Sequence, residues 1–192
     1  MLLYLHGFRS GPRSHKAWML HARMAAQGLG DRFACPQLPP SPRAAIELAE
    51  ELISGSAHPV TLVGSSLGGY YATWLAERHD LRAVLVNPSV VARLSLEKFV
   101  GPQTNLHTGE RFEFTLAHVD ELRRLDAGTL RRPERFWLLA ETGDEVLDYR
   151  QAVTRYRGAR QTVLPGGDHS FTRWQDYLDD IIRFAGETPH QK

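Results

Sequence analysis

The chain has 192 residues, of which 42% are hydrophobic and 23% charged, and a single cysteine. This length suits one compact domain that buries roughly 70% of the surface of its unfolded form, so stability requires neither disulfides nor metal. The formal net charge of +1 does not indicate a surface for nucleic acid, and we predict no nucleic-acid partner. No apolar run reaches the ~18 residues of a membrane helix, and we predict no contact with a membrane.

Apolar runs of strand length alternate along the chain with segments of helical periodicity. Strands are predicted over residues 2–5, 33–38, 60–63, 82–86, 136–140 and 161–164. Helices are predicted over 14–28, 42–53 with Ser41 as N-cap, 70–78, 119–125, 146–156 and 171–184. Short apolar strands between amphipathic helices predict a mostly parallel sheet with helices on both faces.

One stretch does not fit this alternation. Between Asn87 and Pro133 the chain is too long for a simple connection between two such elements. We interpret residues 88–132 as a cap-like insertion over the C-terminal edge of the sheet, within a single domain that spans residues 1–192.

The pentapeptide 64–68 carries the strongest chemical signal. Gly64-Ser65-Ser66-Leu67-Gly68 fits G-x-S-x-G between a predicted strand and a predicted helix, as a nucleophile elbow requires. The turn is sharp and brings the residues two positions on either side of the nucleophile together, so both must be small. Ser66 has glycine at both of these positions, whereas Ser65 has Val63 and Leu67. Ser66 is therefore the predicted nucleophile.

A serine hydroxyl needs a base to remove its proton, and in this fold the order along the chain is serine, acid, histidine. Of the nine histidines, His169 alone lies on the loop after the last predicted strand and follows a candidate acid. We predict that His169 is the base, and that His6, in the first loop, has a structural role.

The acid is expected after the penultimate strand. Asp144 follows Gly143 there, and it would orient the imidazole and stabilise the imidazolium. Glu145 and Asp148 are alternatives. Glu145 is expected to point the other way, and Asp148 to lie at the start of a helix, where an acid favours the helix dipole.

An oxyanion hole needs two backbone N–H donors. The first is predicted at Leu67, directly after the nucleophile, and the second at Phe8, in the loop after the first strand. No metal-binding cluster and no glycine-rich phosphate-binding motif is present in the sequence, so no cofactor and no metal are predicted. The aromatic side chains of Trp18, Tyr70, Tyr71 and Trp74 are predicted to lie in the core or to line a pocket.

Longer stretches resemble the small bacterial esterases of the YqiA type, within the α/β-hydrolase superfamily. The most specific are 63–74 (VGSSLGGYYATW) and 142–153 (TGDEVLDYRQAV). The others are 3–5 with 7–8, 36–40, 86–88, 160–163, and 166–167 with His169. The resemblance implies esterase activity on short acyl esters and on acyl-CoA thioesters, with Ser66, Asp144 and His169 as the triad. It is weaker in the insertion, where Asn105 to Gly109 keep an Asn-x-x-Thr-Gly pattern.

Together these observations predict the α/β-hydrolase fold, with six strands in the order 2-1-3-4-5-6. The predicted protein is a serine hydrolase acting on short-chain carboxylic esters or acyl thioesters, with a small-molecule acyl ester or acyl-CoA as substrate. Two alternatives stay open. An acyl-CoA thioesterase would be favoured by basic residues lining the insertion, such as Arg93, Lys98 and Arg111. A ligand-binding protein that retains the fold would be favoured by a tight ligand without an acyl-enzyme.

The start of the chain and its cysteine bear on location. Residues 1–5 are apolar but lack a basic n-region, which argues against a signal peptide. Cys35 has no partner for an intramolecular disulfide, which suits a reducing compartment. A cytoplasmic protein is expected, and the sequence does not indicate an oligomeric state.

Overall fold

A computed structural model of the protein describes residues 1–90 and 96–186. Its centre is a sheet of six strands in the order β2-β1-β3-β4-β7-β8, in which all neighbours pair in parallel. The strands are β1 (Leu2–Leu5), β2 (Phe33–Ala34), β3 (Thr61–Ser65), β4 (Arg82–Val86), β7 (Phe136–Glu141) and β8 (Arg160–Leu164). Counted without β5 and β6, which form a separate two-stranded sheet, this is the predicted order.

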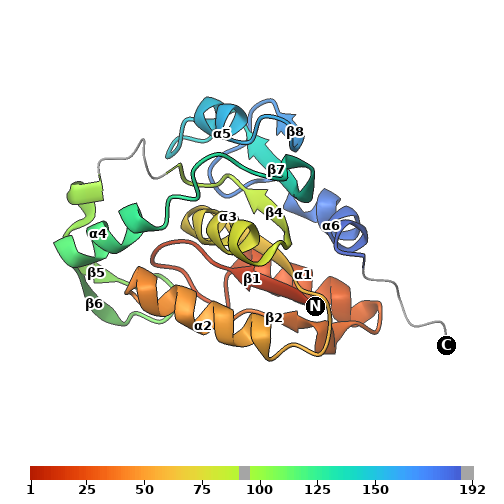
Figure 1. Cartoon of the computed structure of the whole chain (residues 1–192), viewed down its shortest axis with the longest axis horizontal. Helices are drawn as coiled ribbons and strands as arrows, with labels where there is room; N and C mark the ends of the chain where they lie inside the picture. Colours follow the sequence, from red (N-terminus) through yellow and green to blue (C-terminus); the bar gives the residue numbers. More distant parts are fainter. Residues whose placement is uncertain (91–95, 187–192) are drawn as a thin grey trace.

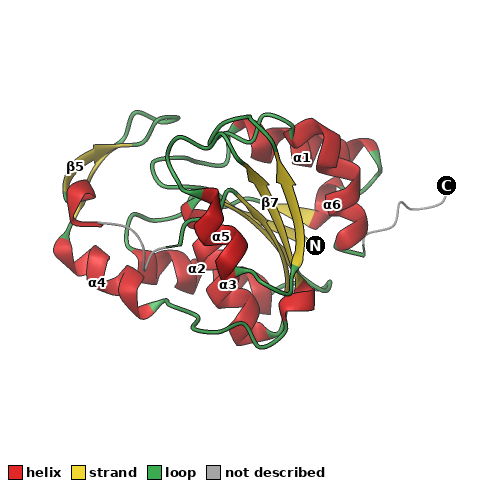
Figure 2. Ribbon diagram, turned by 90° about the horizontal axis from the view of Figure 1, so that it is seen from above, coloured by secondary structure: helices red, strands yellow, loops and turns green. Residues whose placement is uncertain are grey.

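Helices cover both faces of the sheet (Figures 1 and 2). One face carries α2 (Pro42–Ser54), α3 (Leu67–His79) and α5 (Tyr149–Arg155), and the other carries α1 (His15–Ala26) and α6 (Leu178–Phe184). Side chains alternate between the two faces along each strand. In β1, Leu3 and Leu5 pack in the first core, whereas Leu2 and Tyr4 pack in the second. Burial on both sides explains why the strands are continuous apolar runs.

Helix starts follow local capping. The predicted N-cap of α2 is confirmed, since the Ser41 hydroxyl accepts the Ala44 N–H at 3.2 Å and Pro42 is the first helical residue.

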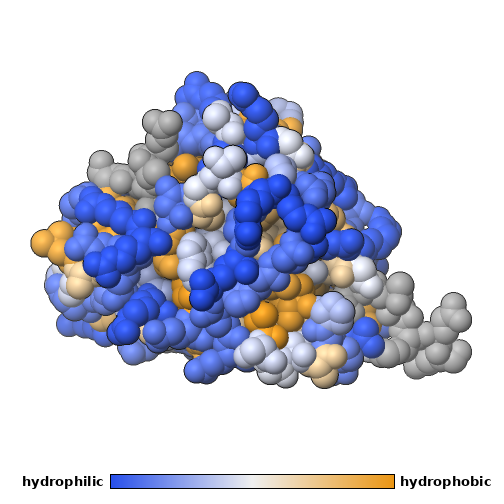
Figure 3. Space-filling view, viewed as in Figure 1, coloured by the Kyte–Doolittle hydropathy of each residue, from blue (hydrophilic) through white to orange (hydrophobic). Residues whose placement is uncertain are grey.

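The face of the molecule shown in Figure 3 is mostly hydrophilic, and its apolar areas are small and separated by polar residues. Trp18, on α1, is 63% exposed and lines a surface pocket, so of the two predicted environments it has the pocket and not the core.

Four predicted elements are shorter in the structure. The first helix spans His15–Ala26 and not residues 14–28. The second strand ends at Ala34 and not at residue 38, because Pro36 has no N–H for the ladder and the Leu38 N–H donates to His6. Helix α5 begins at Tyr149 and not at residue 146. The predicted helix 171–184 is a 3-10 helix, η5 (Trp174–Tyr177), followed by α6.

The insertion contains more regular structure than the one predicted helix. That helix is α4 (Leu116–Arg124), and it follows η3 (Leu96–Phe99) and an antiparallel hairpin of β5 (Gly101–Thr104) and β6 (Arg111–Phe114). Two further 3-10 helices are η1 (Gly30–Arg32) and η4 (Pro133–Arg135). The predicted basic residue Arg93 lies outside the described residues.

The hairpin is attached to the loop after β1. The Leu106 N–H donates to the Arg9 carbonyl at 2.8 Å, and the Asn105 amide donates to the Ser10 carbonyl at 2.7 Å. The ring of Phe8 packs edge-on against Phe99, Phe112 and Phe114, with centroids 5.2–5.9 Å apart. The insertion therefore lies at the C-terminal end of β1.

No helix in the described part of the chain is long and apolar enough to cross a membrane.

Candidate active site

The turn between β3 and α3 holds Ser66 in an unusual backbone conformation, with φ 54° and ψ −119°. Glycine is required on both sides. A Cβ at position 64 would lie 2.3 Å from the Gly68 carbonyl oxygen, and one at position 68 would lie 1.9 Å from the Leu5 carbonyl oxygen. The Ser66 N–H donates to the Val86 carbonyl at 3.0 Å, which anchors the turn to β4. Such strain is found where a side chain must be presented for function.

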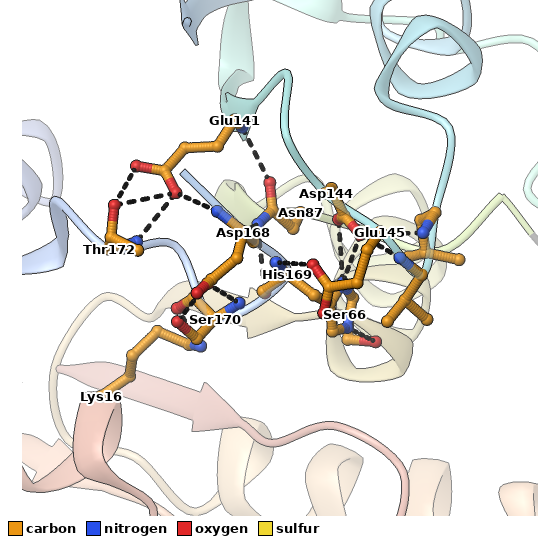
Figure 4. Close-up of polar contacts among 12 residues, drawn as sticks. Lys16, Ser66, Asn87, Glu141, Asp144, Glu145, Asp168, His169, Ser170 and Thr172 are labelled. Carbon is orange, nitrogen blue, oxygen red and sulfur yellow. Dashed lines mark hydrogen bonds and ion pairs between the residues drawn. The ribbon is translucent and has the colours of Figure 1, made fainter. Parts of the chain in front are cut away.

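Three side chains form a chain of hydrogen bonds at this turn (Figure 4). His169 Nε2 lies 3.1 Å from Ser66 Oγ, and His169 Nδ1 lies 2.8 Å from one carboxylate oxygen of Asp144 and 3.0 Å from the other. A carboxylate at Nδ1 keeps the ring proton there, and Nε2 is then free to accept the serine proton. The structure thus brings together the three residues predicted from the sequence.

Asp144 is held from behind by backbone. Its side chain is 2% exposed, and Oδ1 accepts the N–H groups of Val146 and Leu147 at 2.9 and 2.8 Å. This turn displaces the start of α5, where the Asp148 side chain accepts the Arg150 N–H as N-cap. Asp148 therefore lies at a helix start, as expected, and its carboxylate pairs with the side chain of Arg150.

Glu145 does not point away from the site, contrary to the sequence-based expectation. Its Oε2 accepts the backbone N–H of His169 at 3.0 Å (Figure 4). The tight turn at Gly143 and Asp144 places both acidic side chains against the His169 loop. Asp144 contacts the imidazole, and Glu145 contacts the main chain of the same residue.

Two buried polar residues that the sequence analysis did not assign to the site hold the His169 loop. Asn87, directly after β4, donates to the carbonyls of Asp168 and His169 at 3.0 and 3.1 Å and accepts the Glu141 N–H. Glu141, at the end of β7, is fully buried, and its carboxylate accepts the N–H groups of Asp168 and Thr172. The sequence did contain a signal for both residues, because Asn87 directly follows one largely apolar strand and Glu141 ends another.

The charge of Glu141 is balanced within this network. Burial alone would raise the pKa of this carboxyl, but hydrogen bonds from the backbone of Thr172 and Asp168 and from the Thr172 hydroxyl hold it below its usual range. An ion pair with Arg173 at 3.1 Å adds to this. Glu141 is thus an anion that fixes the loop on which His169 lies.

Replacing Glu141 with glutamine is expected to lower the free energy of unfolding at pH 7 by about 2–4 kcal/mol, because the amide turns a donor toward backbone donors. Because the pKa of Glu141 is lowered on folding, its contribution is complete above the unfolded value of about 4.3 and is lost as the pH falls through the folded value. Urea unfolding of the wild type and the variant at pH 7 and at pH 4 and below measures this.

The matched control for that experiment is Glu134→Gln, an exposed glutamate paired with Arg132. It should change the unfolding free energy by no more than about 0.5 kcal/mol. A Glu141→Gln protein as stable as the wild type at pH 7, or a difference that grows as the pH falls, would contradict the assignment.

The first loop of the core passes directly beside Ser66. A Cβ added to Gly7 would lie 3.3 Å from Ser66 Cβ, so a larger residue at this position would press against the nucleophile. Leu67 is the first residue of α3, where helix N–H groups have no intrahelical acceptor. Of the two predicted backbone donors, Leu67 directly follows the nucleophile in sequence, and Phe8 follows Gly7, which lies beside Ser66 in space.

His6 has the structural environment that was expected of it. It is 4% exposed, its Nε2 accepts the Leu38 N–H at 3.0 Å, and Nδ1 lies 2.9 Å from the Gly7 carbonyl oxygen. These contacts require the proton on Nδ1, and burial lowers the pKa of the ring. His6 joins the loop after β1 to the segment that follows β2.

A cavity of about 690 Å³ opens at the triad, lined by Ser66, His169 and Phe8 among others. Lys16, on α1, also lines it. Its Nζ donates to the Ser170 carbonyl at 2.7 Å, and burial lowers the pKa of its ammonium group to about 8. Within residues 1–90 and 96–186, no group of three or more His, Cys, Asp or Glu side chains is arranged to hold a metal ion.

Comparisons with known proteins agree with this arrangement. Residues 1–186 match the family described as "Uncharacterised protein family (UPF0227)", which confirms the resemblance to the YqiA-type proteins. A candidate hydrolase from Agrobacterium vitis S4 has a similar structure, with a TM-score of 0.72 and 21% identity over 95% of this chain and 86% of that one.

Two further structures are similar. A monoacylglycerol lipase from Paleococcus ferrophilus has a TM-score of 0.71 and 15% identity over 96% of this chain and 93% of that one. Alpha/beta hydrolase domain-containing protein 10 from mouse has a TM-score of 0.66 and 16% identity over 95% and 89%. At these identities the likeness shows the fold, and the predicted α/β-hydrolase fold is confirmed.

Proposed function

The chain belongs to the UPF0227 family, and from this premise we propose that it is a serine hydrolase that cuts short-chain carboxylic esters or acyl thioesters through an acyl-enzyme. One observation carries the proposal. Ser66 Oγ lies 3.1 Å from His169 Nε2 in a strained turn, while a buried carboxylate lies 2.8 Å from the other ring nitrogen. This is the arrangement that activates a serine hydroxyl.

The proposed reaction has two halves. His169 Nε2 takes the Ser66 proton as Oγ bonds to the acyl carbon, and the backbone N–H groups of Phe8 and Leu67 stabilise the oxyanion. The bond to the leaving group then breaks, and His169 returns its proton to the departing oxygen or sulfur. In the second half a water molecule gives a proton to His169 and attacks the acyl carbon. His169 then returns this proton to Ser66 Oγ as the bond between Oγ and the acyl carbon breaks, which releases the acid and restores Ser66.

The thioesterase alternative relied on basic residues of the insertion. Of these, Lys98 lies over the ring of Phe99, and Arg111 is on β6. Neither lines the cavity at Ser66. These two residues therefore give no reason to prefer a nucleotide-bearing thiol over an alcohol as leaving group.

A fluorophosphonate probe tests the proposal directly. Mass spectrometry of the intact protein and its peptides should show one probe adduct on Ser66 in the wild type and none in Ser66→Ala. The labelled protein should lose hydrolysis of p-nitrophenyl esters in proportion to labelling. If the folded wild-type protein forms no adduct with the probe, the proposal is wrong and the ligand-binding alternative is favoured.

A further inference from the structure

Two cavities meet at the Gly7–Phe8 turn. The cavity of about 690 Å³ is lined by both Ser66 and His169, whereas a second cavity of about 200 Å³ is lined by Leu67 and by neither of them. Both cavities are lined by His6, Gly7, Phe8 and Ser10. The turn therefore divides the space beside the nucleophile into two compartments.

The direction of proton transfer distinguishes the two compartments. In the reaction proposed above, the leaving group receives its proton from His169 Nε2, so it must lie in the cavity that His169 lines. The carbonyl oxygen points to the N–H groups of Phe8 and Leu67. The acyl chain is bonded to the same carbon and continues past these donors, away from His169. We infer that the small cavity binds the acyl chain and the large cavity binds the leaving group.

The linings fit this assignment, which rests on the proposed function. Most of the exposed lining of the small cavity is apolar and comes from side chains such as Leu38, Leu67, Tyr71 and Phe112, whereas Arg9, Gln37, Asn105 and Glu110 add polar groups. Its volume is below the roughly 300–1,000 Å³ of most ligand pockets, so it suits a short acyl chain. The large cavity is within that range and includes polar groups, among them Ser14, His15, Lys16 and Glu145. The substrate class is a short acyl group on a larger, polar alcohol or thiol.

Phe112 is the residue that sets acyl length. It lies on β6 of the insertion, and its ring packs edge-on against Phe8 with centroids 5.9 Å apart. Phe99 packs against the same ring at 5.8 Å but lines neither cavity. The two phenylalanines therefore form a matched pair. Both contact Phe8, but only Phe112 lines the cavity proposed for the acyl chain.

The first test compares Phe112→Ala with Phe99→Ala on p-nitrophenyl acetate, butyrate, hexanoate and octanoate. Each methylene removed from water is worth about fourfold in binding. The ratio of kcat/KM for octanoate to that for butyrate should rise at least ~10-fold in Phe112→Ala and stay within about twofold of wild type in Phe99→Ala. An unchanged ratio in the first variant, or an equal rise in both, overturns the assignment. If the Phe112→Ala protein does not fold, Phe112→Leu takes its place, because leucine keeps an apolar contact with Phe8. The octanoate-to-butyrate ratio should then rise by a smaller factor.

The reciprocal test narrows the large cavity. Met19 lines it from α1, so Met19→Trp should reduce kcat/KM for 4-methylumbelliferyl butyrate at least ~10-fold relative to methyl butyrate, with the acyl-length ratio unchanged. If Met19→Trp changes the preference for acyl length instead, the large cavity binds the acyl chain and the assignment of the two cavities is wrong. If the wild type hydrolyses none of these esters and Ser66 takes no probe, the proposed function fails and the assignment with it. Turnover with unaltered preferences overturns the assignment alone.

Discussion

Replacing Ser66 with alanine is expected to lower kcat for p-nitrophenyl butyrate by at least ~10⁴-fold. The variant keeps the backbone donors and both cavities, so it should bind substrate and stabilise an oxyanion, but it has no oxygen to form the acyl-enzyme. Residual rate would come from water attack at a bound ester. Steady-state kinetics with active-site titration of the wild type measures the loss.

Ser65→Ala is the control, because it removes the same atom one position earlier in the turn. Ser65 has Val63 and Leu67 two positions away, and its side chain is buried beside Tyr4. This variant should keep most of the wild-type kcat. Comparable losses in both variants would show that the turn has been disturbed, and a Ser66→Ala enzyme with near-full activity would remove Ser66 from the chemistry.

Replacing Asp144 with asparagine should cost about 10⁴-fold in kcat while leaving the fold intact. The reason lies in which oxygen the backbone holds. The N–H groups of Val146 and Leu147 donate to Oδ1, so the amide oxygen of asparagine takes that place. The amide nitrogen then faces Nδ1 of His169 and donates to it. The ring proton moves to Nε2, which can no longer accept the proton of Ser66.

Asp148→Asn is the matched comparison, since it is the same substitution at the rival acid. Asp148 caps α5 and pairs with Arg150, and asparagine is an equally good N-cap, so this change should cost no more than about 1 kcal/mol for the lost surface ion pair and leave kcat within a few-fold. Thermal unfolding and kinetics of the two variants, run side by side, separate the roles. Full activity in Asp144→Asn with a large loss in Asp148→Asn would transfer the role of acid to Asp148.

The sheet and the elbow could be predicted because their signals are local. Buried parallel strands are short apolar runs, and the elbow needs glycine two positions either side of Ser66. The hairpin β5–β6 could not be predicted in this way. Its strands have four residues each and include Pro102, and its attachment depends on contacts such as Asn105 to Ser10, far away in the sequence.

The same limit applied to the residues behind His169. Asn87 donates to a carbonyl 81 positions later, and no local periodicity marks such a partner. The start of α5 was misplaced for a related reason. Apolar periodicity extended the helix to Val146, whereas the carboxylate of Asp144 captures the N–H groups of residues 146 and 147 and keeps them in a turn.

The attachment of the hairpin to the loop after β1 has a consequence for how this enzyme type can diversify. Residues 105 and 106 hydrogen-bond to Ser10 and Arg9, which lie two positions and one position beyond the turn residue Phe8. A hairpin transplanted from a relative would therefore bring its own bracing of that turn, and would alter turnover together with selectivity. Ancestral changes in this insertion should thus have been accompanied by compensating replacements in residues 7–11, and laboratory evolution should randomise the two segments jointly.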